Sequence, residues 1–440
     1  MIEFDNNNKI NAFVICPYVV GQVNRLSEDS RLHEAIGLSL AINVDVVASQ
    51  SVKIKTIKPA TYFSKGIIED AISTINEYNV ELLIVDTKLS PIQQRNLEKE
   101  LKVKVIDRTA LILEIFGERA QTREGVLQVE LAHLTYQRSR LVRSWTHLER
   151  QRGGAGFLGG PGETQIELDR RIIDDKIIKI KKELEKVKKT RSIQRSARQK
   201  IPYPIIALVG YTNAGKSTLF NYLSNSNVMA ENMLFATLDP TMRKINLPSG
   251  KEVILSDTVG FISDLPHELV MAFRATLEEV LNANIILHIR DISNEDNASQ
   301  CADVIDVLHN LGLKEIQNSE NYIEVFNKCD LLDNDNLMLW KNKCNNSQTN
   351  VLVSAYTGDG CDKLLELIDD KLSKNNGIYK VTIPISEGKI LSWIYENSEV
   401  SHIENVDNSN ILVTQISPEN ISRLMKMCEI IPNSIIRKLK

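Results

Sequence analysis

The residues Gly210 to Thr218 read Gly-Tyr-Thr-Asn-Ala-Gly-Lys-Ser-Thr, which fits the pattern G-x-x-x-x-G-K-[ST]. Glycines let backbone N–H groups wrap around phosphate oxygens, a lysine reaches the outer phosphates, and a hydroxyl ligates Mg²⁺. The segment follows the apolar run Ile205–Val209, which is typical of a buried strand, and precedes a helical pattern. This context predicts a phosphate-binding loop in which Lys216 contacts the phosphates and Ser217 contacts the metal.

Three further motifs follow in order, each after a strand-like run. In Asp257-Thr258-Val259-Gly260, the carboxylate can hold Mg²⁺ through water and the glycine N–H can touch the γ phosphate. In Asn327-Lys328-Cys329-Asp330, the aspartate can accept both the N1 and N2 hydrogens of guanine, which adenine lacks, while the lysine stem lies over the ring. Ser354-Ala355-Tyr356 offers a backbone N–H to guanine O6. Each motif alone is weak, but the fixed order predicts a guanine-nucleotide site.

A switch segment must supply a hydroxyl to Mg²⁺ and a backbone N–H to the γ phosphate. Phe235-Ala236-Thr237-Leu238-Asp239-Pro240-Thr241 lies between the first two motifs. We expect Thr237 to fill this role, and Thr241 is the alternative.

The expected nucleotide-contacting residues come from five segments. They are Gly210, Tyr211, Thr212, Asn213, Ala214, Gly215, Lys216, Ser217, Thr218, Phe235, Ala236, Thr237, Leu238, Asp239, Asp257, Thr258, Val259, Gly260, Asn327, Lys328, Cys329, Asp330, Ser354, Ala355 and Tyr356. Ser217 and Thr237 are the expected metal ligands. Lys216, Thr237 and Gly260 are expected to support hydrolysis, and no residue is assigned as a certain catalytic group.

The expected fold is α/β with four parts that position these motifs. Residues 1–118 alternate strand-like and helix-like patterns, which predicts an amino-terminal parallel-sheet α/β domain without a phosphate loop. Residues 201–374 are expected to form a P-loop GTPase domain, a mostly parallel sheet flanked by helices. After a Lys374–Gly377 linker, residues 378–440 read as a small carboxy-terminal α+β domain with a helix near Pro418–Cys428.

Residues 119–200 carry two helical patterns around a glycine-rich stretch. Apolar residues recur every three or four positions over 127–148 and again over 173–187. Matching stripes predict an antiparallel helical hairpin, roughly 35 to 40 Å long at about 1.5 Å per residue. The polar, basic segment Thr190–Pro204 with two prolines is expected to be the connector to the next domain.

The stretch Gly153–Gln165 holds six of the twenty glycines and contains a literal G-x-G-x-x-G. A dinucleotide loop must follow a buried strand, whereas this stretch follows a charged helical segment. Thr164-Gln165-Ile166-Glu167 reads as a capping box that starts the second hairpin helix. Residues 153–162 are therefore expected to be the hairpin loop. Because helical hairpins turn in about two to five residues, we expect this longer glycine-rich loop to gain its order on a partner.

The charge of the chain is uneven. The net charge is −4, but Lys176–Lys200 contains eleven lysines and arginines and two glutamates, a local charge of +9. Such asymmetry favours an anionic partner such as folded RNA, recognised by shape and backbone; the alternative is a solvated helix face.

Neither a membrane span nor a zinc site is expected. The longest apolar runs are strand-sized, well below the roughly 18 residues that a span needs, and the first residues show no secretory signal. We therefore expect a cytoplasmic protein. The cysteines at 16, 301, 329, 344, 361 and 428 form no Cys-x-x-Cys pair and have no histidine nearby in sequence, which argues against zinc and disulfides.

Five segments together closely resemble the HflX family of ribosome-associated GTPases. They are GGPGETQIELDRR (159–171), GYTNAGKSTLFN (210–221), FATLDPT (235–241), DTVGFI (257–262) and LPHELVMAFRATLEE (265–279). The resemblance covers about Asp107 to Leu372. It implies a GTPase that uses Mg²⁺ and GTP, binds the large ribosomal subunit, and splits or rescues ribosomes, often under stress. It also implies that the hairpin tip reaches rRNA near the peptidyl-transferase centre. We expect a monomer that does not bind DNA.

One departure from the common GTPase pattern affects the mechanism. The residue after Gly260 is Phe261, where many GTPases have a glutamine that orients the attacking water. Slow intrinsic hydrolysis is expected, with the missing element supplied by the ribosome, another residue or a cation. Asn213 resembles the asparagine of GTPases in which K⁺ replaces an arginine finger, and the alternative is that it only braces the loop. Arg290 is assigned no role.

Overall fold

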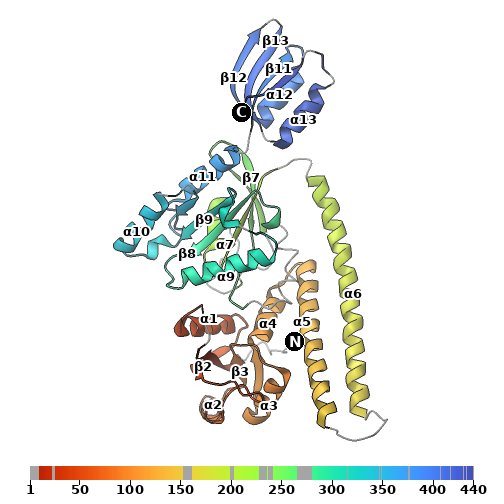
Figure 1. The fold of residues 1–440 in the computed structure, drawn as a ribbon, viewed down its shortest axis with the longest axis vertical. Coiled ribbons are helices and arrows are strands. Elements are labelled where there is room, and N and C mark those ends of the chain that lie inside the picture. Colours follow the sequence, from red (N-terminus) through yellow and green to blue (C-terminus); the bar gives the residue numbers. More distant parts are fainter. Residues whose placement is uncertain are drawn as a thin grey trace. The chain divides into compact units, whose positions relative to one another are not determined.

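Three β-sheets organise the part of the chain that the structure describes (Figure 1). The structure is a computed structural model. It describes residues 9–21, 25–151, 161–198, 203–226, 235, 241–264, 280–314, 316–345, 347, 349–374, 377–406, 408–416, 418–429, 431–432 and 434–439. The chain forms two compact units, one of Met1–Ile245 with Val253–Asp359 and a second of Asn246–Glu252 with Gly360–Lys440.

The first sheet is parallel, as its sequence pattern predicts, with strand order β2-β1-β3-β4. Its strands are β1 (Asn11–Val19), β2 (Asp45–Ile54), β3 (Leu82–Val85) and β4 (Lys104–Asp107), and its helices are α1 (Glu28–Leu40), α2 (Lys65–Glu77), α3 (Pro91–Leu101) and α4 (Arg108–Arg119). Every residue of β3 is buried, which explains its continuous apolar run. In a parallel sheet, β3 and β4 end side by side, so Asp86 and Asp107 lie at the same edge.

Two long helices, α5 (Arg123–Gln151) and α6 (Pro161–Arg198), form the hairpin. Their contact is apolar, as the two stripes predict. The buried residues of this seam are Leu127, Leu134, Ile177, Ile180 and Leu184. The part of the tip loop from 152 to 160 lies outside the described residues.

Three expectations about the second hairpin helix are wrong. It begins at Pro161, so Thr164 lies inside the helix and does not start it with a capping box. Proline suits the first helical turn because its missing N–H has no partner there anyway. The helix also continues through Arg198, because 190–198 contains neither proline nor glycine, so most of the expected connector is helical. At 38 residues, α6 is about 57 Å long rather than 35 to 40 Å.

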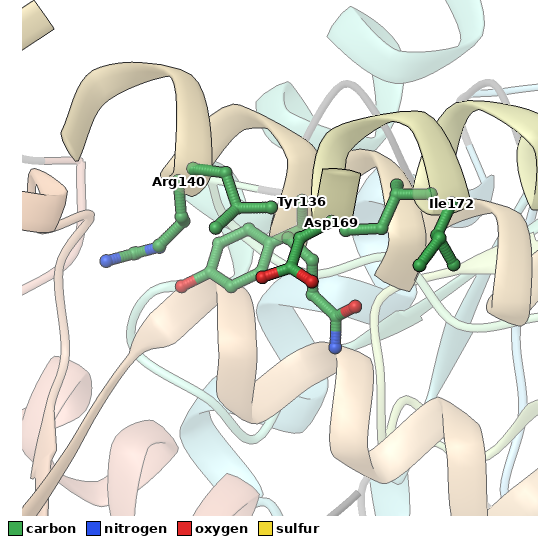
Figure 2. Close-up of a pocket in the computed structure, with 7 residues that line it drawn as sticks. Tyr136, Arg140, Asp169 and Ile172 are labelled. Atoms are coloured by element: carbon green, nitrogen blue, oxygen red, sulfur yellow. The ribbon is translucent and has the colours of Figure 1, made fainter. Parts of the chain in front are cut away.

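An ion pair and a hydrogen bond attach α5 to the carboxyl edge of the first sheet. Arg140 Nη2 donates to Asp107 Oδ2 at 2.6 Å, and the Tyr136 hydroxyl donates to Asp107 Oδ1 at 2.8 Å. Next to this anchor, residues of both hairpin helices line an open pocket of about 460 Å³, with Tyr136 and Arg140 from α5 and Asp169 and Ile172 from α6 (Figure 2).

The second sheet has the order β10-β9-β8-β5-β7-β6, and parallel pairing joins β10, β9, β8, β5 and β7. Its strands are β5 (Ile205–Gly210), β6 (Thr241–Asn246), β7 (Glu252–Asp257), β8 (Ile285–Asp291), β9 (Tyr322–Asn327) and β10 (Asn350–Leu352). The helical segments of this region are α7 (Lys216–Ser224), α9 (Asn297–Asn310), η1 (Ile316–Asn318), η2 (Cys329–Leu331) and α10 (Asn334–Asn345). The chain leaves β5 for β6 and β7 on one side and then returns to β8 on the other. Such a reversal of strand order is where ligands bind in open α/β sheets.

The second unit contains an antiparallel sheet with the order β12-β13-β11-β14. Its elements are α11 (Cys361–Lys374), β11 (Gly377–Pro384), α12 (Gly388–Asn397), β12 (Glu399–Val406), β13 (Ser409–Ile416), α13 (Pro418–Cys428) and β14 (Ile435–Lys438). Helix α13 has the predicted bounds, whereas β12, β14 and α12 were not anticipated. Within this unit, Asp369 of α11 accepts hydrogen bonds from the N–H and the hydroxyl of Ser249, both at 2.8 Å. Among the described residues, no helix combines the length and the apolar character that crossing a membrane requires.

Candidate nucleotide-binding site

Four of the five predicted nucleotide segments follow or end strands of the second sheet and meet at its carboxyl edge. The phosphate loop follows β5, Asp257 ends β7, and Asn327 ends β9. Ser354 follows β10 by two residues. Because β5, β7, β9 and β10 run parallel, their motifs are brought to one edge although they are up to about 140 residues apart in sequence.

The phosphate loop needs glycine where it passes closest to the rest of the site. Gly215 has a φ of +91°, and a Cβ there would lie 2.2 Å from Asn327 Nδ2, so a side chain would displace the guanine motif. Asn213 is exposed and has a φ of +59°, a left-handed conformation that asparagine tolerates better than most residues. The backbone conformation therefore gives a reason for Asn213 that does not involve a cation.

Lys216 is buried at the start of α7, and its ammonium donates to the Tyr211 carbonyl at 2.7 Å. Burial lowers the pKa of this lysine to about 8, and the nearby Asp257 carboxylate opposes that shift. A buried cation without an ion pair is costly, so a polyphosphate at this position would be strongly attracted to Lys216.

Ser217 and Asp257 form an oxygen-rich pair beside the loop. The serine hydroxyl donates to Asp257 Oδ2 at 2.7 Å, and the aspartate is completely buried. Hydroxyl and carboxylate oxygens are the ligands that Mg²⁺ prefers, so the donor set fits this ion. Thr258 has another task, since its hydroxyl donates to the Leu208 carbonyl at 2.6 Å and ties the end of β7 to β5.

Gly260 lies tightly against the phosphate loop. A Cβ at this position would be 3.0 Å from Lys216 Nζ and 2.9 Å from Thr212 Cγ2. The next residue, Phe261, is 2% exposed and pairs with the loop through two backbone hydrogen bonds, to Gly210 O (3.1 Å) and from Thr212 N (2.7 Å). The apolar side chain that replaces the usual glutamine is therefore packed in the core, which agrees with its inability to orient water.

The guanine motifs are linked by the Asn327 carboxamide. Its Nδ2 donates to the Ala214 carbonyl and its Oδ1 accepts the Ala355 N–H, both at 2.9 Å. The Ser354 hydroxyl donates to Asp330 Oδ1 at 2.6 Å, which orients the carboxylate expected to read guanine. One buried amide thus joins the phosphate loop to both base-recognition motifs.

Other predicted residues of these motifs are more open to solvent. Lys328 has a left-handed backbone and its ammonium pairs with Asp291 at 2.6 Å, while Tyr356 is 86% exposed. Cys329 is half-buried, and burial raises the pKa of its thiol, so it is poorly suited to act as a nucleophile.

Most of the predicted switch segment lies outside the described residues, including Ala236, Thr237, Leu238 and Asp239. Phe235 is described and is 3% exposed, with its ring 4.7 Å from that of Phe116 on α4. Thr241, the alternative to Thr237, begins strand β6.

The structure also assembles a cluster that the sequence did not reveal. His288, Cys301 and Glu324 place potential metal-ligand atoms within 4.8 Å of one another, although they are far apart in sequence. The Arg290 guanidinium occupies Glu324 at 2.9 Å, and burial together with the charges of Arg290 and Lys216 lowers the pKa of His288 to about 3. These positive surroundings disfavour a cation, so we assign the cluster, and with it Arg290, a structural role.

Tyr211 makes a contact with the amino-terminal domain that no sequence motif predicted. Its hydroxyl donates to Glu34 of α1, in the amino-terminal domain, and accepts the Ser263 N–H at 2.9 Å. Glu34 and Tyr211 are 177 residues apart and neither belongs to a pattern that pairs them, so only the folded chain shows this link.

Four family models match the chain: "GTP-binding GTPase N-terminal" over residues 29–117, "GTP-binding GTPase Middle Region" over 119–198, "50S ribosome-binding GTPase" over 205–328 and "HflX C-terminal domain" over 339–430.

Several similar curated proteins are named "GTPase HflX". The "GTPase HflX" of Magnetococcus marinus is 47% identical over 393 residues, which is 89% of each chain. Those of Caldanaerobacter subterraneus (40% identical, 90% of this chain and 89% of that one) and Escherichia coli (42% identical, 78% and 79%) are also similar.

Proposed function

The chain belongs to the HflX family of GTPases, and from this premise we propose that it binds the large ribosomal subunit and uses GTP binding and hydrolysis to split or rescue stalled ribosomes. The observation that carries the proposal is the meeting of four guanine-nucleotide motifs at one sheet edge. The Asn327 carboxamide joins the phosphate loop to both base-recognition motifs, and Ser217 joins it to Asp257. The match to a family model described as a 50S ribosome-binding GTPase supports the choice of partner.

The chain's own residues bind and orient the nucleotide. Lys216 would exchange its bond to the Tyr211 carbonyl for the outer phosphates, and Asp330, oriented by Ser354, would accept the guanine hydrogens. Ser217, with Asp257 behind it and Thr237 from the switch, would hold Mg²⁺, which neutralises charge that develops on the phosphates.

Hydrolysis on the free protein should be slow, because Phe261 is apolar and buried. We propose that the ribosome completes the site, so that GTP turnover depends on the correct partner. A K⁺ ion bound near Asn213 would be a second source of positive charge. The exposed side chain of Asn213 could reach such an ion, while its left-handed backbone supports the alternative that Asn213 only braces the loop.

The hairpin is the proposed ribosome-contacting element. On α6 the lysines at 176, 179, 181, 182 and 186 are all exposed, and the seam with α5 occupies the opposite, apolar positions. Such a face can bind rRNA phosphates, with an affinity that falls steeply as salt rises. We propose that the glycine-rich tip reaches rRNA near the peptidyl-transferase centre.

Sucrose-gradient profiles of intact ribosomes test the proposal. The purified chain is mixed with ribosomes and GTP, a non-hydrolysable GTP analogue or GDP. Conversion to subunits with the analogue is the expected result. Binding without splitting supports the alternative function, an RNA-binding assembly factor whose nucleotide site acts mainly as a sensor. Failure to co-migrate with ribosomes under all three conditions contradicts both functions.

A monomeric state in the cytoplasm and the absence of DNA binding remain predictions. Light scattering on the purified chain, cell fractionation and a DNA-binding titration check them in turn.

A further inference from the structure

A closed polar cluster joins the amino-terminal domain to the nucleotide site within the first unit. The hydroxyl of Tyr211, the second residue of the phosphate loop, donates to Glu34 Oε2. The hydroxyl of Ser263, three residues after Gly260, donates to Glu34 Oε1 at 3.0 Å, and the Ser263 N–H donates to the Tyr211 hydroxyl at 2.9 Å. One carboxylate therefore holds both the phosphate loop and the segment that follows Asp257-Thr258-Val259-Gly260.

Arg108 holds that carboxylate from the other side. Its guanidinium donates to Glu34 at 2.5 Å, to Asp86 at 2.5 Å and to the Ser263 carbonyl at 3.0 Å. Burial opposes the charge of Arg108, but the two carboxylates outweigh burial and hold its pKa well above the ordinary value. The charged groups are fixed in one geometry, because a buried charge that loses its partner is costly.

Apolar contacts surround the cluster. The ring centroids of Phe116 and Phe235 are 4.7 Å apart. One continuous apolar cluster includes Leu113 of α4 together with Phe261 and Ile262. At the edge of this contact, Arg25 pairs with Asp303 at 2.6 Å and with Asp306 at 2.7 Å. The cluster around Glu34 is therefore part of an extended contact between the two domains.

The consequence falls on Gly260. Phe261 is bonded to the phosphate loop by its backbone, and Ser263 is bonded to Glu34, so the three residues that follow Gly260 are fixed at two points. Gly260 is thereby held close to Thr212 and to the Lys216 ammonium. Gly260 is the residue of the Asp257-Thr258-Val259-Gly260 motif that is expected to meet the terminal phosphate of GTP, which GDP lacks.

We propose that Glu34 is a positioning residue of the nucleotide site, which holds Gly260 ready for the γ phosphate and so makes the amino-terminal domain a determinant of GTP-over-GDP preference. The inference rests on the proposed function in that GTP is the ligand. Because coupling is reciprocal, GTP must tighten the contact between the two domains by the same factor.

The affinities of the full-length chain for a non-hydrolysable GTP analogue and for GDP test this. Glu34→Gln keeps the size of the side chain but removes its charge, and we expect about a tenfold loss of analogue affinity with GDP affinity within about twofold of wild type. The matched control is Glu28→Gln on the same helix, whose carboxylate bonds to Ser51 at 2.8 Å and lies near Lys53, away from the site. This control should change neither affinity.

A second variant guards against a misfolded Glu34→Gln protein. Ser263→Ala removes one hydrogen bond to Glu34 and one from Arg108, whose two carboxylate partners remain. It should shift the same ratio in the same direction by a smaller factor. An unchanged ratio in both folded variants overturns the proposal, as does an equal loss for GDP and the analogue. If the wild-type chain itself binds neither guanine nucleotide, the proposed function fails instead.

Discussion

The amino-terminal sheet and the GTPase sheet are both parallel, yet their carboxyl edges carry opposite chemistry. In the GTPase sheet, β5 leads into a glycine-rich loop and a buried lysine, and β7 ends at Asp257 beside the Ser217 hydroxyl. In the amino-terminal sheet, Asp86 directly follows β3 and Asp107 ends β4, and both are buried and paired with arginines of the same chain.

The difference teaches that sheet geometry offers an edge, and the residues after the strands decide its use. Glycine and lysine leave a positive, backbone-lined space for an anion. Paired aspartate and arginine fill the edge with protein, so the charges that a phosphate needs are already neutralised. The described part of the amino-terminal edge therefore serves to hold the hairpin and the GTPase domain.

We call the edge of the amino-terminal sheet, with Asp86 and Asp107 paired to arginines, the filled edge. Removing one of its ion pairs should have the largest effect, which is a loss of stability. Asp86→Ala leaves Arg108 and Arg31 without their shared carboxylate, and we expect a loss of about 3–5 kcal/mol in the free energy of unfolding. Urea denaturation measures it, with the exposed Asp45→Ala as the control. A loss below about 1 kcal/mol would mean that this edge is not held by its ion pairs.

We call the edge of the GTPase sheet, with the phosphate loop, Lys216 and Asp257, the open edge. A substitution there should weaken nucleotide binding and leave stability unchanged. Lys216→Ala removes a buried ammonium that has no carboxylate partner at salt-bridge distance in the described structure, so we expect about a hundredfold loss of GTP affinity, near 2.7 kcal/mol, without a lower melting temperature. The control is Lys88→Ala, an exposed lysine near the end of β3. Calorimetric titration and thermal melting give the two quantities, and a marked drop in melting temperature would contradict the contrast.

The pH dependence of binding sharpens the same contrast. Burial lowers the Lys216 pKa to about 8 in the nucleotide-free chain, and bound phosphates should raise it again. GTP binding should therefore take up most of one proton at pH 8.5 and little at pH 7, and affinity should fall as pH rises above about 8. Titration calorimetry in buffers with different ionisation enthalpies counts the protons. Equal uptake at both pH values, or proton release at pH 8.5, contradicts the assignment.

The smallest effect is expected from the cation. If K⁺ binds beside Asn213, GTP hydrolysis in KCl should exceed that in NaCl of equal concentration by several-fold, and Asn213→Gly, which keeps the left-handed backbone accessible, should remove the difference. Equal rates for the wild-type chain in the two salts would leave Asn213 with the bracing role alone.

Local motifs in the sequence predicted the open edge well. The phosphate loop, Asp257 and Asn327 each follow a strand, and their chemistry depends on residues within a few positions. The filled edge was not predictable, because Glu34, Arg108 and Ser263 are brought together from distant segments and none belongs to a motif. The same holds for His288 with Cys301 and Glu324.

The wrong predictions about the second hairpin helix have a different cause. The basic, polar character of 190–198 indicated a connector, but lysine and arginine are good helix formers, and the helix ends at Arg198, before the two prolines. The basic composition of 190–198 indicates what the segment can bind, whereas the helix propensity of its residues determines whether it is helical.

The central claim is that GTP binding at the open edge enables the helical hairpin to split the ribosome. Light scattering of intact ribosomes, recorded after mixing with the GTP analogue and the chain, tests it most directly when the wild type is compared with a variant in which residues 154–160 are shortened. We predict a fall in scattering for the wild type, and no fall for the variant although its GTP affinity is unchanged. Unchanged scattering with the wild type, or equal splitting by the shortened variant, would contradict the account.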